Sequence, residues 1–266
     1  MTTFRDLHAP GQFLILPNAW DAGSARILES RGASAIATSS AAVAWAAGYP
    51  DGNALPPAVL VRIIESITRV IRVPLSVDSE AGYASDPAQV EENIFLFAGA
   101  GAVGINLEDG TDSSDLLCRK IEAAKRGAQR AGVDLFVNAR IDVLLKQLVP
   151  REQAIEEGLA RAARYRDAGA DGIFLPLVAE AQEIETVVRA IDPLPLNVLA
   201  SPGVPPAAEL RRLGARRLSA GAAIGRAALA LASKLAERFL ADGDSDALYA
   251  HIGERIDLNA LFPKSE

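Results

Sequence analysis

A short pattern recurs along this chain: a helical stretch ends in glycine and alanine, and a short apolar run follows. The pattern appears at Gly32-Ala33, Gly101-Ala102, Gly169-Ala170 and Gly214-Ala215. Glycine suits the left-handed residue just past the end of a helix, and a continuous apolar run is typical of a strand covered on both faces. The repeated order therefore predicts alternating strands and helices.

The apolar runs define eight candidate strands. They are Phe13–Leu16, Ala35–Thr38, Pro74–Asp78, Val103–Leu107, Leu135–Ala139, Gly172–Leu175, Leu196–Leu199 and Arg217–Ala220. The clearest helix between them begins with Asp86 as N-cap and Pro87 at the first helical position. Val90, Ile94 and Phe97 then share one apolar face.

Eight strands alternating with helices over 266 residues predict a closed (β/α)₈ barrel of the TIM type, which typically needs about 250 residues. We expect one domain over residues 1–266, with 242–266 as a C-terminal tail and an extra helix over Ala247–Leu261. The alternative is an open doubly wound sheet, which would want a glycine-rich phosphate loop after its first strand. The chain has Pro17-Asn18-Ala19-Trp20 there.

Composition indicates in which compartment the protein resides and which classes of partner it binds. No apolar run approaches the roughly 18 residues of a membrane span, and the N-terminal segment resembles no signal peptide, so we expect a cytoplasmic protein that binds no membrane. The net charge of −7 comes without long charged blocks, which favours a small-molecule ligand over nucleic acid. The densest basic group, Arg211, Arg212, Arg216 and Arg217, is interpreted as a solvated helix end.

Three acidic residues follow neighbouring candidate strands. Asp78 ends the third strand, Glu80 lies two residues later on the same side, and Glu108 follows the fourth strand. Active sites of such barrels lie at the carboxyl ends of the strands, and like charges crowded there are costly unless a cation lies among them. Oxygen ligands favour Mg²⁺ or Mn²⁺ over zinc. The alternative is three solvated loop acids.

The fifth strand carries a second polar group. Asn138, Arg140 and Asp142 share one face there. A guanidinium can bind a carboxylate or phosphonate through two parallel hydrogen bonds, so we expect Arg140 to bind a substrate anion. The alternative is a purely structural pair with Asp142.

Small hydroxyls follow the second strand. Ser39, Ser40 and nearby backbone N–H groups could hold a second anionic group, and Asp51 could reach a metal through water. These small residues could equally serve close packing.

Several kinds of chemistry are excluded. The two histidines, His8 and His251, lie outside every candidate strand, which argues against a histidine acid–base pair or a zinc triad. The single cysteine, Cys118, lies in a helical pattern, can form no internal disulfide and is interpreted as a packed thiol. A metal, an arginine and small hydroxyls remain, which suit the stabilisation of an enolate or similar oxyanion.

Five motifs in this order resemble the isocitrate lyase/phosphoenolpyruvate mutase superfamily over Phe13 to Ala230. They are TSSAAVAWAAGYPDG (38–52), DSEAGY (78–83), LEDG (107–110), NAR (138–140) and LGARRLSAG (213–221). The resemblance implies a Mg²⁺-dependent enzyme that binds 2-oxo or 2-hydroxy acids and works on C–C or P–C bonds through an enolpyruvate-like intermediate. It also implies a homo-oligomer, a dimer or tetramer, with an exchanged helix over Ala222–Leu240.

The resemblance also implies roles for individual residues. The implied metal shell consists of Asp78, Glu80, Glu108 and, through water, Asp51. The implied substrate-binding residues are Arg140, Asn138 and the loop Ser39, Ser40 and Ala41. Glu108, Asp51, Arg140 and Tyr83 are the candidate catalytic residues, with Tyr83 and Asp51 the first candidates for an acid if isocitrate is cleaved without the lid.

Two positions depart from the family pattern. The family usually has aspartate where this chain has Glu80. Lyases and mutases of the family also carry a lid loop after the position of Glu108, whereas this chain has only the short segment Asp109–Ser114 before the next helix. We therefore expect a Mg²⁺-dependent lyase that cleaves or decarboxylates a small 2-oxo or 2-hydroxy dicarboxylate. The alternatives are P–C bond chemistry on a phosphonopyruvate-like substrate and a 2-oxo-acid binding protein without turnover.

Overall fold

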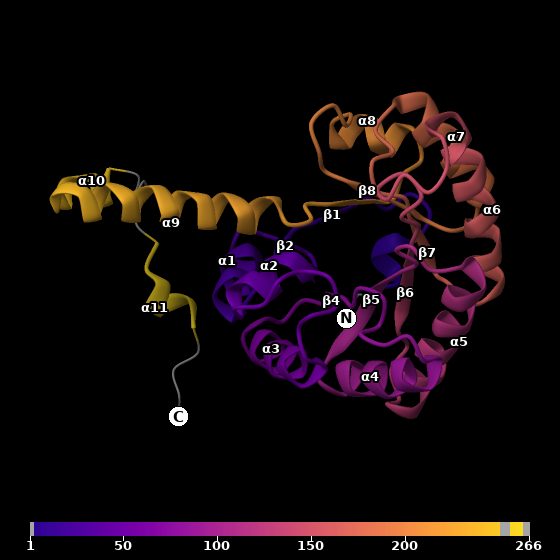
Figure 1. Ribbon diagram of the computed structural model, residues 1–266, viewed down its shortest axis with the longest axis horizontal. Helices are drawn as coiled ribbons and strands as arrows, with labels where there is room; N and C mark the ends of the chain where they lie inside the picture. The colour runs from indigo at the N-terminus through magenta and orange to yellow at the C-terminus, as the bar shows by residue number, and fades with distance from the viewer. Residues whose placement is uncertain (1–2, 251–255, 263–266) are drawn as a thin grey trace.

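The computed structural model describes residues 3–250 and 256–262, and its strands form one parallel sheet that closes on itself (Figure 1). The sheet order is β1-β9-β8-β7-β6-β5-β4-β3-β2. β1 (Leu14–Leu16) pairs with β9 (Arg217–Ser219), while β2 (Asn18–Ala19) pairs with β3 (Ile36–Thr38). The first wall of the barrel is therefore one strand divided at Pro17, a residue that has no N–H to donate. This confirms the (β/α)₈ barrel and excludes the doubly wound sheet.

The remaining strands are β4 (Leu75–Asp78), β5 (Ala102–Glu108), β6 (Phe136–Arg140), β7 (Gly172–Phe174) and β8 (Leu196–Leu199). All eight predicted strands are confirmed to within about one residue at each end. The helices that follow them are α1 (Ala22–Ser30), α2 (Ser40–Ala46), α3 (Pro57–Val70), α4 (Pro87–Gly99), α5 (Ser114–Arg130), α6 (Ala154–Asp167), α7 (Ala181–Ile191) and α8 (Ala207–Arg212). Short 3-10 helices lie at η1 (Asp6–His8) and η2 (Arg151–Gln153).

The helix α4 begins as its sequence predicts. The Asp86 carboxylate accepts a hydrogen bond from Ala88 N at 3.0 Å, and Pro87 occupies the first turn. Val90 and Phe97 on its apolar face are fully buried against the barrel. A local cap and a matching apolar stripe thus specify the same helix.

The base of the barrel is closed by the N-terminal segment. Phe4 packs in a buried apolar cluster with Leu14, Leu16 and Phe136. Its ring occupies the space over Gly104, where a Cβ would lie 2.5 Å from a ring carbon. His8 is buried beside it and stacks on Phe136 with ring centroids 4.3 Å apart. The lower interior is therefore apolar and filled.

Part of the basic group near β9 does not lie where it was predicted. Arg211 and Arg212 are exposed at the end of α8, as expected, and Arg216 is partly buried with Nη1 donating to Pro193 O at 2.9 Å. Arg217 is 1% exposed inside the barrel. Its assignment to a solvated helix end was wrong, because Arg217 is the first residue of a strand and its side chain lies on the inward side.

The chain beyond the barrel is mainly one long helix. α9 (Ala223–Asp242) extends away from the barrel and ends at Gly243, which is left-handed with φ 70° (Figure 1). The single helix expected over Ala247–Leu261 is wrong, because two short helices, α10 (Ser245–Tyr249) and α11 (Leu258–Leu261), lie in its place. Asp244 and Asp257 each cap a new helix start. Of the described helices, none combines the length and apolar character of a membrane span.

Candidate active site

Three predicted site residues end three adjacent strands. Asp78 is the last residue of β4, Glu108 of β5 and Arg140 of β6. Asp78 pairs in register with Asn106, and Glu108 pairs with Arg140, so all three lie along one rim at the carboxyl ends of the strands. The Arg140 Nη1 lies 2.7 Å from Glu108 Oε2. The fold thus brings the acids and the arginine together, as parallel strands in register require.

Asp78 is fixed by the segment that follows β3. One carboxylate oxygen, Oδ2, accepts a hydrogen bond from Ser40 N at 3.1 Å, and Asp78 N donates to Thr38 Oγ1 at 2.9 Å. Ser39 is the N-cap of α2, and its hydroxyl accepts from Ala42 N at 3.4 Å. The predicted anion loop therefore lies directly against the first predicted metal ligand.

Glu80 is buried and strained. Its φ of 48° is in the left-handed region, which costs about 1 kcal/mol or more for a residue with a Cβ. Its Oε2 accepts a hydrogen bond from Asn53 N, which ties the loop that carries Asp51 to the rim. Burial raises the pKa of Glu80, and the charges of Asp78 and Asp51 raise it further. Such strain persists only where surrounding contacts impose it, as at functional sites.

Each of the three acids keeps one buried oxygen without a hydrogen bond among the described residues. These atoms are Asp78 Oδ1, Glu80 Oε1 and Glu108 Oε2, the last of which contacts Arg140 as an ion pair but is not aligned for a hydrogen bond. Unpartnered carboxylate oxygens fit a hard divalent cation. As the side chains stand, the described acidic, histidine and cysteine residues form no ready group of three around one metal position. Binding an ion there requires side-chain movement.

Burial and mutual repulsion shape the charge of the rim. Burial raises the pKa of Glu108, the Arg140 guanidinium opposes that shift, and Asp78, Asp142 and Glu80 add to it. An acid cluster of this kind binds a proton readily, and a bound cation would favour the ionised form instead.

Arg140 makes the structural pair that was weighed as an alternative. Its Nε and Nη2 donate to Asp142 at 2.7 and 3.0 Å. Asp142 N in turn donates to Asp109 Oδ1 at 2.8 Å. The carboxylate of Asp109 also accepts from Arg161 Nη1 at 2.8 Å and from the Tyr165 hydroxyl at 2.7 Å. Arg140 is therefore held rigidly, with Nη1 turned toward Glu108.

Asp109 was not among the predicted site residues. Its partners lie 52 and 56 residues further along the chain on α6, so no local motif reveals the contact. Asp109 O also accepts from Asp112 N at 2.7 Å, which closes the segment after Glu108 into a tight turn before α5.

Tyr83 lies beside the acids of the rim, whereas Asn138 lies below the rim. The Tyr83 hydroxyl is buried, has no hydrogen-bond partner among the described residues, and has its pKa raised by burial and by the nearby charges of Glu80 and Asp78. Asn138 lies below the rim, where its Nδ2 donates to Asn106 Oδ1 at 2.9 Å. Tyr83 can thus hold a proton beside the acids, while the Asn138 amide already has a partner.

The residues used to exclude other chemistry lie away from the rim. His8 is at the base of the barrel, and burial lowers its pKa to about 3. Cys118 is half-buried on α5, with Sγ 3.7 Å from Arg164 O. His251 lies outside the described residues.

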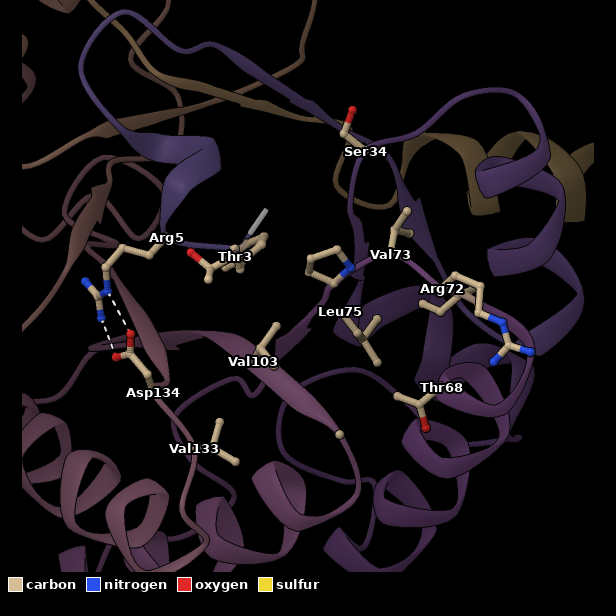
Figure 2. A pocket seen from close by; sticks show the side chains of 14 residues that line it. Thr3, Arg5, Ser34, Thr68, Arg72, Val73, Leu75, Val103, Val133 and Asp134 are labelled. Carbon is tan, nitrogen blue, oxygen red and sulfur yellow. Dashed lines mark hydrogen bonds and ion pairs between the residues drawn. The ribbon is translucent and has the colours of Figure 1, made fainter. Parts of the chain in front are cut away.

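A cavity of about 690 Å³ opens at the opposite end of the barrel (Figure 2). It is lined by the starts of strands, including Leu75 and Val103, and by the N-terminal segment. Of its two arginines, Arg5 and Arg72, the first is already paired with Asp134 at 2.8 Å. Because chemistry in these barrels occurs at the other end of the strands, we assign the candidate site to the acidic rim.

The chain is similar to several known proteins. The model of the family described as phosphoenolpyruvate phosphomutase matches residues 4–240. An uncharacterized protein of Mycobacterium tuberculosis is 35% identical over 244 residues, which cover 91% of this chain and 90% of that protein. An oxaloacetate decarboxylase of Pseudomonas fluorescens is 29% identical over 82% of this chain and 77% of its own length. A crystal structure of a provisionally assigned phosphonomutase from Burkholderia cenocepacia matches with a TM-score of 0.82 and 41% identity over 88% of this chain and 97% of that one.

The Asp109 contacts generate a stability prediction. Asp109→Asn removes the charge that faces Arg161 in a buried position, so we expect the free energy of unfolding to fall by about 2–3 kcal/mol. The control is Asp115→Asn, which breaks an exposed pair with Arg164 and should cost about 0.5 kcal/mol or less. Urea unfolding followed by circular dichroism measures both. Equal losses in the two variants would contradict the supporting role of Asp109.

Proposed function

Since this chain belongs to the phosphoenolpyruvate phosphomutase family, we propose that it is a Mg²⁺-dependent lyase that cleaves or decarboxylates a small 2-oxo or 2-hydroxy dicarboxylate. The resemblance to the isocitrate lyase/phosphoenolpyruvate mutase superfamily is confirmed, and the chain is an enzyme of that carbon–carbon lyase type. The choice of substrate and metal is our inference from the site.

The observation that carries the proposal is the set of three buried carboxylate oxygens on one rim that have no hydrogen-bond partner among the described residues, although Glu108 Oε2 is ion-paired with Arg140. Asp78, Glu80 and Glu108 would hold the ion, with Asp51 reaching it through water. Bound Mg²⁺ would supply a Lewis acid that polarises the 2-oxygen of the substrate. Mn²⁺ has the same preference for oxygen ligands and is an alternative ion.

Arg140 is proposed to orient the substrate. Its guanidinium is 16% exposed and already rigid through Asp142, so it would meet a carboxylate without losing much side-chain freedom. The Ser39 and Ser40 hydroxyls and the Ala41 N–H would hold the second anionic group. Asn138 would act from below, through Asn106, rather than by direct contact.

The proton at the reacting carbon has two sources. Tyr83 keeps its proton, because burial raises its pKa, and its hydroxyl lies beside the acids. Solvent is the second source, since the short turn after Glu108 provides no long lid to exclude water. Decarboxylation of a 2-oxo dicarboxylate asks least of such a site, because only one proton has to be added to the product enolate.

P–C bond chemistry on a phosphonopyruvate-like substrate is the second candidate, since the matching family model is that of a phosphomutase. A 2-oxo-acid binding protein without turnover is the alternative of another class, and the short turn after Glu108 is what favours it.

A homo-oligomer is also proposed. The helix α9 leaves the barrel with Leu229, Leu231 and Phe239 between 41 and 45% exposed. A pocket of about 310 Å³, lined by Trp20, Ile27 and other residues of α1, lies at its base. An exposed apolar helix beside an apolar pocket is typical of a face covered by another copy.

The metal site generates the first functional prediction. Asp78→Ala should weaken Mg²⁺ binding by about 100-fold or more, because losing a ligand exceeds the 10–100-fold loss typical of supporting residues. Glu80→Asp should be much milder, since it keeps the charge. Isothermal titration calorimetry measures both, with Asp115→Ala as the exposed control. Unchanged affinity in a folded Asp78→Ala protein would rule out the assigned site.

The second functional prediction concerns which substrates the protein converts. With Mg²⁺ we expect oxaloacetate to give pyruvate and CO₂ at a measurable rate, and isocitrate to give little or no glyoxylate. Phosphonopyruvate is assayed in parallel for phosphate or phosphoenolpyruvate. Robust glyoxylate release would contradict the argument from the short turn. Calorimetric binding of oxaloacetate with no product would favour the binding protein.

The third functional prediction concerns the assembly of copies through the exposed helix α9. Sedimentation should give a mass of two or more chains of 28.0 kDa each. The double change Leu229→Asp and Leu231→Asp should yield the monomer, whereas Leu177→Asp, 45% exposed on the barrel, should not. A wild-type mass of one chain would contradict the proposed assembly.

A further inference from the structure

Arg217 is a charged residue at the centre of the barrel for which the proposed chemistry has no use. It begins β9, lies in register with Asn197 of β8 and Leu14 of β1, and is 1% exposed. β9 and β5 are separated in the sheet by three strands. Arg217 Nη2 nevertheless donates to Asn106 Oδ1 on β5 at 3.3 Å, so the side chain crosses the interior.

The layer around Arg217 is polar and incompletely hydrogen-bonded. Its Nε and Nη1 have no partner among the described residues, and the same holds for both side-chain atoms of Asn197 and for Ser76 Oγ. Asn106 Oδ1 accepts from Asn138 as well as from Arg217. This layer lies between the apolar plug around Phe4 and the acidic rim, because Ser76 precedes Asp78, and Asn106 precedes Glu108, by two residues on their strands.

A guanidinium in this position is costly without compensation. Among the described residues, no carboxylate lies within 4.0 Å of Arg217, although every other buried or half-buried guanidinium of the candidate site has such a partner. Burial lowers the pKa of Arg217 to about 9, and the charge of Asp78 opposes that shift. The group is therefore still a cation at neutral pH, and its favourable interaction is with Asp78 of the rim above it.

The acidic rim carries excess negative charge, whereas Arg217 is a positive charge without a nearby carboxylate among the described residues. Glu80 is buried and Asp78 and Glu108 are half-buried on one rim, and Arg140, the cation among them, is shared with Asp142. One further positive charge beneath the rim stabilises the carboxylates when no ion is bound. The same charge repels an incoming Mg²⁺, and this repulsion is stronger than in bulk water because Arg217 is buried.

We propose that Arg217 is a positioning residue that acts as a built-in counter-charge beneath the acidic rim and thereby sets its affinity for a divalent cation. The inference rests on the proposed Mg²⁺ site. It explains how the acids of the rim coexist before an ion binds, and it predicts that the natural affinity for Mg²⁺ is lower than the ligands alone would give. A role in packing alone predicts no such restraint.

The test separates the effect of the Arg217 charge on Mg²⁺ binding from the effect of the size of its side chain. Arg217→Met removes the charge and keeps a long apolar side chain, whereas Arg217→Lys keeps the charge. Arg216→Met is the matched control, since that neighbour contacts Pro193 outside the barrel. Calorimetric titration with MgCl₂ should show Arg217→Met binding Mg²⁺ about tenfold more tightly than wild type. Arg217→Lys and Arg216→Met should stay within about threefold.

A second measurement separates this role from a structural one. The gain in Tm on adding saturating Mg²⁺, relative to EDTA, should be larger for Arg217→Met than for wild type, because tighter binding to the folded state stabilises it more. If Arg217→Met does not fold without Mg²⁺, Arg217→Gln takes its place with the same expectation. Unchanged or weaker Mg²⁺ binding by a folded neutral variant would overturn the inference. Absence of Mg²⁺ binding by the wild type would overturn the proposed metal site itself.

Discussion

The parallel register of β4, β5 and β6 is the constraint on which the site depends. Each strand ends in a charged residue, and the pairing of Glu108 with Arg140 places two of them side by side at 2.7 Å. A shift of one residue would turn these side chains toward the helices. It would also turn the inward-facing Asn106 and Asn138, which are hydrogen-bonded to each other, toward the apolar helices, so the side chains below the rim oppose that shift.

Electrostatic balance is the second theme of the molecule. The acids are buried where their charges repel, and separate guanidinium groups meet them from different directions: Arg140 at the rim, Arg161 behind Asp109 and Arg217 from below. The Arg140 guanidinium opposes the burial that raises the pKa of Glu108. Some carboxylate oxygens of the rim have no hydrogen-bond partner among the described residues, so they are available to bind an ion reversibly.

The sequence predicted the strands well because burial on both faces produces continuous apolar runs and glycine marks the helix ends. The acids were predictable because their positions follow directly from those strands. Asp109 and Arg217 were not. The partners of Asp109 lie on a distant helix, and although the sequence predicts that Arg217 begins a strand, it does not show that its side chain faces the inside of the barrel. The two short helices after Gly243 were missed because each starts at its own aspartate cap within a stretch that reads as one helical pattern.

The divided first strand has a consequence for how the chain reaches this structure. β1 finds its partner only in β9, about two hundred residues later, while β2 pairs with the next strand along the chain. Closure therefore waits for the last strand, and contacts of such long sequence separation form slowly. β9 also carries Arg217, so the wall that completes the barrel brings in the buried cation. During synthesis on the ribosome, the nascent barrel exposes an open seam, with its acids already gathered, until its final strand has emerged.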